Sequence, residues 1–279
     1  MSQVWFNGQL QEAPFLVDTS NRAFRYGDGL FETVRVVYNR APFLHQHYIR
    51  FIEGMDMLRF DIPEHWSFTF LQKELDKLVR ANDLQHARVR MTAWREGAGT
   101  HIPEQHTASL LMEAFPLEEP YFQLNKEGLL IGVYSELRKE IHPLSSHKSA
   151  NARPYVQAAI FAAEQSWDDA LILNTDGRPA DALQSSIFCW KNETLCTTAD
   201  GDGGVDGVMR RVLLKAAKQW GMPFSTEHMS IEELQAADEI FLTNTMQGIR
   251  WVGQWGDRVY DNRMAGILTG KLNEMLPLS

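Results

Sequence analysis

The sequence contains very little cysteine and no cluster of metal-binding side chains. Only two of its 279 residues are cysteines, Cys189 and Cys196, which is too few for a disulfide framework. Both fall in apolar, strand-like stretches, where an unpaired thiol usually packs as a small hydrophobic group. No group of His and Cys residues has the spacing of a metal site. We therefore expect two reduced core cysteines and no bound metal.

The sequence also lacks a long apolar run and an excess of positive charge. No stretch approaches the ~20 apolar residues of a membrane span, and the N-terminus MSQVWFNGQL has no basic segment followed by an apolar one. The formal net charge is −9, so neither nucleic acid nor a membrane surface is expected as a partner. These absences predict a cytoplasmic protein in which local positive groups hold any anionic ligand.

The composition supports a large folded core. Hydrophobic residues make up 44% of the chain and aromatic residues 11%, which suits one large domain or two of ordinary size. The segment Pro116–Gly128 is polar, contains two prolines and shows no clear periodicity. We interpret it as a link and predict an N-terminal domain over 1–117, a linker over 118–127 and a C-terminal domain over 128–279.

Strand-like and helical patterns follow one another without a regular βαβ rhythm. In the first half we expect a hairpin at Asn7-Gly8, strands over Ala23–Tyr26, Leu30–Tyr38, Ala87–Trp94 and Ala108–Phe115, and helices over His47–Phe60 and around Leu71–Leu78. In the second half we expect strands over Leu129–Tyr134, Ala170–Leu173, Ser186–Trp190 and Asp238–Thr243, a hairpin over Trp251–Val259, and helices over Tyr155–Gln165, Gly207–Trp220, from Ser230 and from Ala265. This mixture predicts an α+β or irregular α/β fold and not a doubly wound one.

Several segments could carry chemistry, but each also has an ordinary explanation. Lys148, in HPLSSHKSANARPY, would by itself be a solvated surface lysine. The stretch FRYGDGLFETVRV, residues 24–36, would be a tight hairpin. Arg50 would be solvated or paired with Glu53 on the same helix.

A glycine-rich segment precedes one of the expected helices. Residues 203–210, GGVDGVMR, would expose unpaired backbone N–H groups at the positive end of the helix dipole, where a phosphate can bind. Thr243-Asn244-Thr245, at the end of a strand, adds hydroxyl and amide donors. Each feature is common alone, so only their combination is informative.

Taken in order, these segments resemble a known family. The chain carries FxYGDGxFE, HxxR, KxxN, DGxxxD followed by SIF, GVxGVMR and TNT, from about Trp5 to Val252. No single motif is specific, but six in this order and spacing are. The order resembles the class IV aminotransferases, the fold-type IV enzymes that use pyridoxal 5'-phosphate (PLP). The resemblance implies a smaller N-terminal α/β domain, a larger C-terminal domain with a mixed-sheet pseudo-barrel, a small amino substrate and a homodimer.

The resemblance also implies a role for each motif. Lys148 matches the Schiff-base lysine, which carries the cofactor and then exchanges a proton at the substrate Cα. Arg50 matches the arginine that binds the cofactor phosphate. Asp181 stands where the family usually has a glutamate facing the pyridine nitrogen, so the contact could be direct, longer or bridged by water; the alternative is a surface Asp after a turn. Backbone and turn groups of the phosphate site match Gly207, Val208, Met209, Asn244 and Thr245.

Departures from the motifs bear on the reaction. Arg153 replaces a tyrosine that branched-chain transaminases carry five residues after the lysine, and Met209 replaces a threonine common among transaminases. The string GVMR resembles aminodeoxychorismate lyases, whereas Phe31-Glu32-Thr33 looks more like a transaminase. We predict a lyase that converts 4-amino-4-deoxychorismate to 4-aminobenzoate and pyruvate. The alternatives are a branched-chain or D-amino acid aminotransferase and, more remotely, a non-catalytic relative that binds PLP.

Four residues are candidates for binding the substrate. Arg95 lies in a loop where the family often binds the substrate carboxylate, and His101 lies near the position of a carboxylate-binding histidine in D-amino acid transaminases. Both could instead be surface residues. Phe31 and Arg153 complete the set.

Overall fold

The computed structural model describes residues 2–278, which form two compact units. The first contains the described chain up to Pro120, residues 147–151 and the chain from Leu276 onward; the second contains Tyr121–Ser146 and Ala152–Met275. The main division thus falls within the segment expected as a linker. Residues 147–151, expected in the C-terminal domain, pack with the first unit although the segments on both sides belong to the second.

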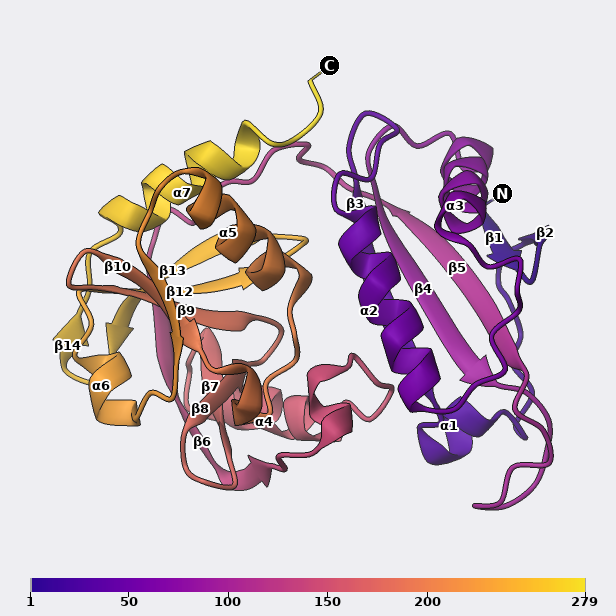
Figure 1. The fold of residues 1–279 in the computed structure, drawn as a ribbon, viewed down its shortest axis with the longest axis horizontal. Coiled ribbons are helices and arrows are strands. Elements are labelled where there is room, and N and C mark those ends of the chain that lie inside the picture. The colour runs from indigo at the N-terminus through magenta and orange to yellow at the C-terminus, as the bar shows by residue number, and fades with distance from the viewer. Residues whose placement is uncertain (1, 279) are drawn as a thin grey trace. The chain divides into compact units, whose positions relative to one another are not determined.

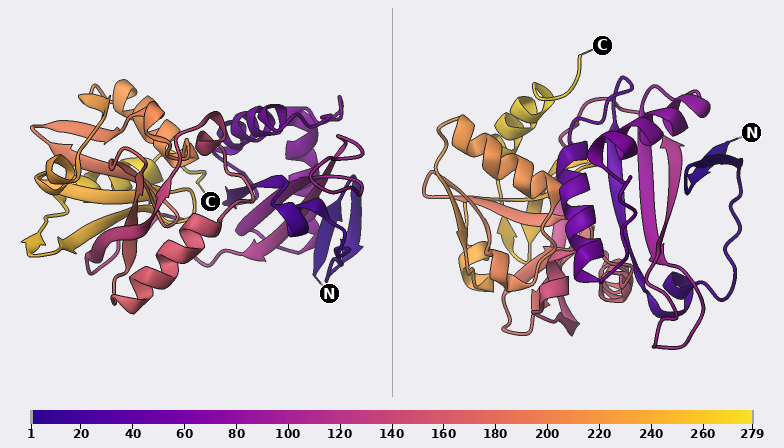
Figure 2. Two further views of the ribbon diagram at one scale, coloured as in Figure 1. Left: turned by 90° about the horizontal axis from the view of Figure 1, so that it is seen from below. Right: turned by 45° about the vertical axis from the view of Figure 1, so that its right-hand side comes forward.

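The first unit is built on a five-stranded antiparallel sheet. Its order is β2-β1-β5-β4-β3, with β1 Gln3–Phe6, β2 Gln9–Glu12, β3 Gly29–Val36, β4 Ala87–Arg95 and β5 Ala108–Pro116. Asn7 (φ 44°) and Gly8 (φ 97°) form the tight turn of the predicted hairpin. Two helices, α2 (Leu44–Met57) and α3 (Phe68–Ala81), cover one face of this sheet (Figures 1 and 2).

The core of the first unit confirms the two predicted helices. Leu71, Leu75 and Leu78 of α3 are buried with Phe51 and Met55 of α2. These positions recur every three or four residues, so each helix buries one apolar stripe against the sheet.

One predicted strand of the first unit is wrong. Residues Ala23–Tyr26 belong to a short helix, α1 (Arg22–Tyr26). The Asn21 side chain accepts the Phe24 N–H and begins the helix, and Gly27, at φ +68°, ends it. A helix of five residues is too short to show a helical repeat in its apolar residues.

The second unit contains a mixed, curled sheet. Its path is β11-β10-β9-β12-β13-β6-β7-β8, and β14 pairs with β13 (Figure 1). β6 runs parallel to β7 and β13, and β10 runs parallel to β11, whereas the other pairs are antiparallel. The predicted mixed fold without a regular βαβ rhythm is confirmed. The strands are β6 Leu129–Lys139, β7 Asp169–Asn174, β8 Pro179–Ala182, β9 Ser186–Lys191, β10 Thr194–Thr198, β11 Phe224–Glu227, β12 Glu239–Asn244, β13 Gly248–Trp255 and β14 Arg258–Val259.

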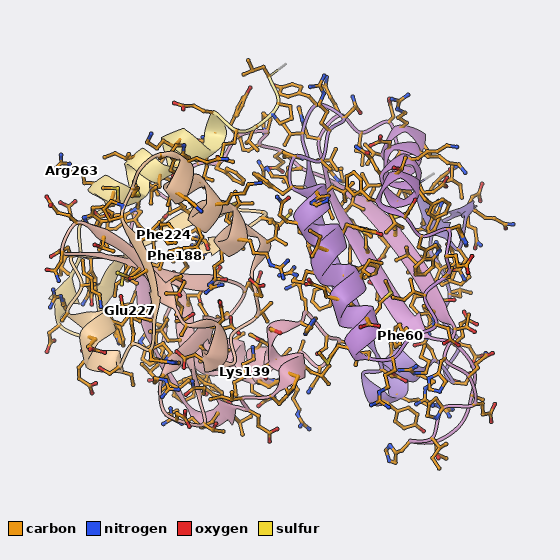
Figure 3. The ribbon with its side chains drawn as sticks, viewed as in Figure 1. Phe60, Lys139, Phe188, Phe224, Glu227 and Arg263 are labelled. Atoms are coloured by element: carbon orange, nitrogen blue, oxygen red, sulfur yellow. The ribbon has the colours of Figure 1, made fainter. Side chains whose placement is uncertain are left out.

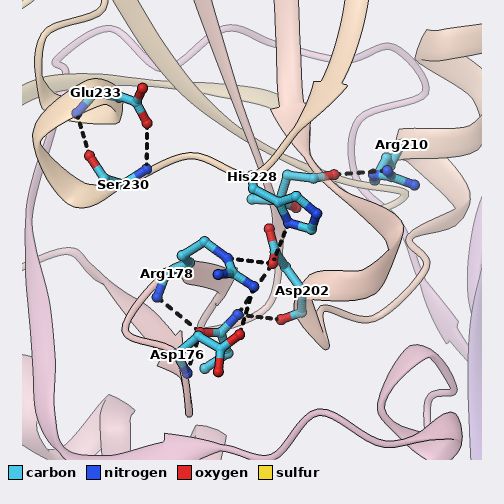
Figure 4. Close-up of polar contacts among 9 residues, drawn as sticks. Asp176, Arg178, Asp202, Arg210, His228, Ser230 and Glu233 are labelled. Atoms are coloured by element: carbon cyan, nitrogen blue, oxygen red, sulfur yellow. Dashed lines mark hydrogen bonds and ion pairs between the residues drawn. The ribbon is translucent and has the colours of Figure 1, made fainter.

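The helices of the second unit lie close to their predicted positions. They are α4 Arg153–Glu164, α5 Val208–Gln219, α6 Ile231–Gln235 and α7 Arg263–Asn273, with short 3-10 turns at Pro143–Ser146 and Asp200–Asp202. Ser230 and Glu233 form the predicted capping box at the start of α6 (Figure 4).

The fold bears on the two cysteines and on membrane-spanning helices. Cys189 and Cys196 are unpaired and buried, on opposite positions of β9 and β10. Within residues 2–278, no helix has both the length and the apolar character needed to cross a bilayer.

Candidate active site

In the first unit, the Lys148 segment pairs with the edge strand β3. The Phe31 N–H donates to the Lys148 carbonyl (2.9 Å), and the Ala150 N–H donates to the Gly29 carbonyl (2.8 Å). The Lys148 Nζ lies 4.6 Å from the centre of the Phe31 ring. The sheet edge therefore fixes the backbone of the predicted Schiff-base lysine, and an aromatic ring lies beside its amine.

A buried carboxylate lies one residue further along β3. Arg50 of α2 donates from Nε to Glu32 Oε1 (2.7 Å) and from Nη2 to Oε2 (2.6 Å). Burial alone would raise the pKa of Glu32, but the Arg50 guanidinium and His47 outweigh burial and lower that pKa to about 2. Glu32 is therefore ionised at neutral pH, and its carboxylate holds the Arg50 side chain from the neighbouring strand.

His47, one turn before Arg50, completes this cluster. Its Nδ1 lies 2.6 Å from Glu32 Oε2. Burial lowers the pKa of His47 despite the opposing charge of Glu32, and Lys148 lowers it further. A neutral His47 must donate from Nδ1 to the ionised Glu32, which leaves Nε2 as an acceptor. That buried Nε2 has no hydrogen-bond partner among residues 2–278.

Arg90 is a cation near Phe31 that the sequence interpretation missed. The Arg90 guanidinium carbon lies 4.0 Å from the centre of the Phe31 ring, which also has the Lys148 Nζ nearby. Burial lowers the pKa of Arg90, partly offset by Glu113. The alternation of polar and apolar residues along β4 was the available signal, since it places Arg90 on the same sheet face as Phe31.

Arg95, predicted to bind the substrate carboxylate, instead makes its hydrogen bonds within the first unit. It donates to Asp28 Oδ2 (3.0 Å), the Arg59 carbonyl (3.0 Å) and the Leu58 carbonyl (2.6 Å), and its Nη1 lies 2.8 Å from His106 Nδ1. An arginine has five N–H donors, so most of them serve to hold loops of the first unit. We therefore do not propose Arg95 as a substrate ligand.

Two other substrate candidates are exposed. His101 lies on a loop with its ring centre 5.3 Å from that of Tyr26. Arg153 is the exposed first residue of α4, in the second unit.

The second unit holds the predicted phosphate-binding groups. Gly207 is the N-cap of α5 and makes no side-chain cap, so the first N–H groups of this helix, at Val208 and Met209, are not used by a capping side chain. A Cβ on Gly207 would lie 2.3 Å from Ser186 Oγ. A side chain at position 207 would therefore require the Ser186 hydroxyl of β9 to move.

A buried hydroxyl lies beside this helix start. Thr243 of β12 is directly opposite Ser186 of β9, so both side chains point to the same sheet face. Thr243 Oγ1 has no hydrogen-bond partner within the part of the chain that the structure describes. The helix start and this hydroxyl provide donors suited to an anion.

Ion pairs fix the loop that precedes α5. Asp202 Oδ1 accepts from Arg178 Nε (2.7 Å) and lies 2.9 Å from His228 Nδ1 (Figure 4). Arg210 donates to the Thr198 carbonyl (2.9 Å) and to Asp200 Oδ1 (2.6 Å). The loop therefore has a defined shape, and Arg210 serves to hold it.

The predicted turn after β12 is shaped by its own asparagine. Asn244 Oδ1 accepts the N–H groups of Met246 (3.0 Å) and Gln247 (2.8 Å), and its Nδ2 donates to Ser185 Oγ (3.1 Å). The neighbouring Thr245 is buried. The Asn244 side chain therefore fixes the geometry of this turn.

Asp181 is a buried residue of β8 and not a surface residue. It is 3% exposed. Its Oδ2 accepts from Lys139 Nζ (2.6 Å) and Tyr155 Oη (2.8 Å), and the Val205 N–H lies 3.1 Å from Oδ1 and 3.0 Å from Oδ2. Lys139 is the last residue of β6 (Figure 3). Neither Lys139 nor Tyr155 was among the predicted residues.

The predicted site residues thus form two sets, each within one unit. The first unit holds Lys148, Arg50, Phe31, Arg95 and His101, and the second holds Asp181, Gly207, Val208, Met209, Asn244, Thr245 and Arg153. Across residues 2–278, no group of three or more His, Cys, Asp or Glu side chains could hold a metal ion.

Comparison with known proteins identifies the family. Residues 29–255 match the family model of class IV aminotransferases. The chain is 27% identical to a Methanocaldococcus jannaschii protein provisionally named a branched-chain-amino-acid aminotransferase, over 98% of this chain and 94% of that protein. It is also 27% identical to the aminodeoxychorismate lyase of Bacillus subtilis, over 87% of this chain and 83% of the lyase. The crystal structure of a branched-chain aminotransferase from Thermoproteus uzoniensis has the same fold, with a TM-score of 0.88, 24% identity and coverage of 97% and 93% of the two chains.

The chain therefore belongs to the class IV aminotransferase family and is an enzyme with the fold-type IV architecture. Its cofactor is PLP, which this family uses. The residues present suit that cofactor. In the second unit, the start of α5 has no capping side chain and the Thr243 hydroxyl has no hydrogen-bond partner among the described residues, and both features suit a phosphate. In the first unit, the half-buried Lys148 is a lysine of the kind that could hold the cofactor through its amine.

Proposed function

We propose that this enzyme is a 4-amino-4-deoxychorismate lyase, which forms 4-aminobenzoate and pyruvate. The observation that carries the proposal is the start of α5, where Gly207-Val208-Met209-Arg210 matches the string found in the lyases. Met209 is 1% exposed, so its side chain packs in the core and the helix offers backbone N–H groups in place of a threonine hydroxyl.

The substrate chemistry supports the same proposal. 4-Amino-4-deoxychorismate is a cyclohexadiene that carries one carboxylate on the ring and a second on its enolpyruvyl ether. In the first unit, the Arg90 guanidinium lies next to the Phe31 ring. An apolar ring and a forked cation together suit a substrate that has both a diene and carboxylates.

Lys148 has two tasks in this proposal, cofactor attachment and proton transfer. PLP supplies an electron sink for the negative charge that develops when the substrate loses a proton. The Lys148 Nζ would remove the proton from the ring carbon that bears the amine. The electrons left on that carbon form a ring double bond as the bond between the neighbouring carbon and the ether oxygen breaks, and Nζ would return one proton to the departing enolpyruvate, which leaves as pyruvate. Arg50 and the start of α5 would bind the cofactor phosphate, and Asp181 would pair with the pyridine nitrogen.

An assay of the purified enzyme distinguishes the lyase from its alternative. Chorismate and an amidating synthase generate the substrate, and the lyase proposal expects 4-aminobenzoate and pyruvate in equal amounts. Keto acids formed from amino acids, without 4-aminobenzoate, would instead establish an aminotransferase acting on a branched-chain or D-amino acid. That second candidate is supported by Phe31-Glu32-Thr33 and by the relative from M. jannaschii.

The role of Lys148 has its own test. Borohydride reduction of the holoenzyme followed by peptide mapping is expected to find PLP attached at Lys148. The Lys148→Ala variant should lose both the label and turnover. A variant that stays yellow and is still bleached by borohydride would overturn the assignment, and a labelled wild type that turns over neither substrate class would support a non-catalytic relative.

We also propose that the enzyme is a cytoplasmic homodimer, as its family resemblance implies. Light scattering during size-exclusion chromatography is expected to give twice the mass of the 31.9 kDa chain. A mass equal to that of one chain would contradict the dimer.

A further inference from the structure

The carboxylate of Asp181 is held asymmetrically. Its Oδ2 receives Lys139 Nζ (2.6 Å), Tyr155 Oη (2.8 Å) and the Val205 N–H (3.0 Å), whereas Oδ1 receives only that same N–H, at 3.1 Å. An ionised carboxylate offers about four acceptor positions, two on each oxygen. Oδ2 is therefore fully used, and Oδ1 is the oxygen that can take another donor.

Lys139 uses all three of its N–H groups within this cluster. They reach Asp181 Oδ2 (2.6 Å), Tyr155 Oη (2.7 Å) and the Ser145 carbonyl (3.2 Å). Since Tyr155 accepts from Lys139, its own hydrogen points to Asp181. Burial, reinforced by the Asp181 carboxylate, raises the pKa of Tyr155 well above its usual value, so the hydroxyl keeps the hydrogen that it donates.

The cluster is assembled from four separate elements of the second unit. Lys139 ends β6, Tyr155 lies in the first turn of α4, Asp181 lies in β8, and Val205 lies in the loop before α5. A Cβ on Gly204 would lie 2.5 Å from the Ala180 carbonyl. Glycine at 204 thus lets the loop approach β8 closely enough for the Val205 N–H to reach both oxygens.

We propose that Lys139, supported by Tyr155, is a positioning residue for Asp181: it holds this buried carboxylate in one orientation through Oδ2 and leaves Oδ1 to receive the N–H of the cofactor's pyridine ring. The inference rests on the proposed role of Asp181 at that nitrogen. It accounts for an aspartate where the family usually has a glutamate, because the shorter side chain is held in one orientation by three donors. Without the Lys139 ammonium, the carboxylate loses its charged hydrogen bond at Oδ2 and can turn, so Oδ1 is no longer held towards the ring nitrogen.

The test uses holoenzyme reconstituted with PLP that is isotopically labelled at the ring nitrogen. Nitrogen NMR reports whether that nitrogen is protonated, and equilibrium dialysis measures the affinity for PLP. In Lys139→Met the ring signal should move towards that of the unprotonated nitrogen, and affinity should fall roughly tenfold, as expected for loss of a charged hydrogen-bond partner. Lys139→Arg should recover most of both values, and Tyr155→Phe should shift both less and in the same direction.

Lys191→Met is the matched control. Lys191 is also a strand-end lysine of the second unit paired with a carboxylate, Glu227, at 3.2 Å. This variant should keep the wild-type signal and affinity. A shift as large as that of Lys139→Met would overturn the inference, because loss of any paired lysine would then have the same effect.

Asp181→Asn separates this inference from the proposed role of Asp181. If Asp181→Asn leaves signal and affinity unchanged, the proposed role of Asp181 fails. If Asp181→Asn changes both while a folded Lys139→Met keeps wild-type values, only the role of Lys139 is overturned. Circular dichroism establishes folding, and if Lys139→Met is unfolded, Tyr155→Phe decides: an intermediate shift supports the inference, and wild-type values overturn it.

Discussion

Glu32, which binds Arg50 in the first unit, and Asp181 in the second unit are both buried carboxylates, but the two are bound differently. Glu32 in the first unit gives both oxygens to the forked guanidinium of Arg50 and accepts from His47 as well. Asp181 in the second unit concentrates its strong contacts on Oδ2. Glu32, with both oxygens engaged, supports its neighbours. Asp181 keeps an acceptor position on Oδ1 for a further donor.

The largest effect is expected from removing the first carboxylate. Glu32→Ala removes the carboxylate that accepts two hydrogen bonds from the buried Arg50 guanidinium, which should lower the free energy of unfolding by about 3–5 kcal/mol. The matched control is Asp56→Ala, at an exposed position of α2, where about 0.5 kcal/mol or less is expected. Urea denaturation measures both. Equal losses would show that Glu32 does not support the cluster.

Protonation of Glu32 at low pH should cost somewhat less stability than its replacement by alanine. The pKa of Glu32 is lowered from 4.5 to about 2 in the folded protein. Its contribution to stability is therefore complete above pH ~4.5 and is lost as the pH falls through about 2, a difference on the order of 3 kcal/mol. Glu32→Gln should flatten this part of the stability–pH curve relative to the wild type. Parallel curves for the two proteins would contradict the ion pair.

A substitution at Gly207, the N-cap of α5, tests whether this helix start binds PLP. In Gly207→Ala the new Cβ would lie 2.3 Å from Ser186 Oγ, and the resulting overpacking should cost about 1–3 kcal/mol. It should also weaken PLP binding. Gly270→Ala in α7 is the control, because no atom lies within 4 Å of the new Cβ and helix propensity should add about 0.5–1 kcal/mol. Unchanged PLP affinity in Gly207→Ala would remove this helix start from the proposed site.

The smallest effect on stability is expected from His47, the neutral partner of Glu32. Burial lowers the pKa of His47 below 6.5, so its contribution favours the folded state above pH 6.5 and declines as the pH falls below that value. His47→Gln keeps a donor for Glu32 and should remove this decline between pH 7 and 5 in thermal melting curves. His101→Gln, at an exposed position, should leave the wild-type profile unchanged. If His101→Gln has the larger effect, His47 is not the neutral partner.

The family motifs and the mixed fold could be recognised from the sequence, because each motif and each helix or strand pattern lies within a few consecutive residues. The partners of those residues could not. Local spacing suggested a solvated Arg50 or one paired with Glu53, and it gave no sign of Glu32, which lies on a strand 18 positions away and accepts from Arg50. Lys139 and Asp181 are 42 positions apart and meet only after β6 and β8 are folded.

The surroundings of two candidate residues also depend on folding. Asp181 lies on β8, a strand of four residues that begins with proline and therefore resembles a turn. Arg95 lies at the end of a strand, next to a loop where the family places substrate ligands. Its contacts with Asp28 and the Leu58 and Arg59 carbonyls could be recognised only once the first unit was assembled.

The pairing of residues 147–151 with β3 limits how far this protein can be divided. A fragment that ends at Pro120 would lack Lys148 and would expose the Gly29 carbonyl and the Phe31 N–H along an open strand edge, a known route to aggregation. The two units therefore cannot be exchanged between relatives as consecutive gene segments. A functional chimera would have to exchange the five residues around the lysine together with the strand that receives them.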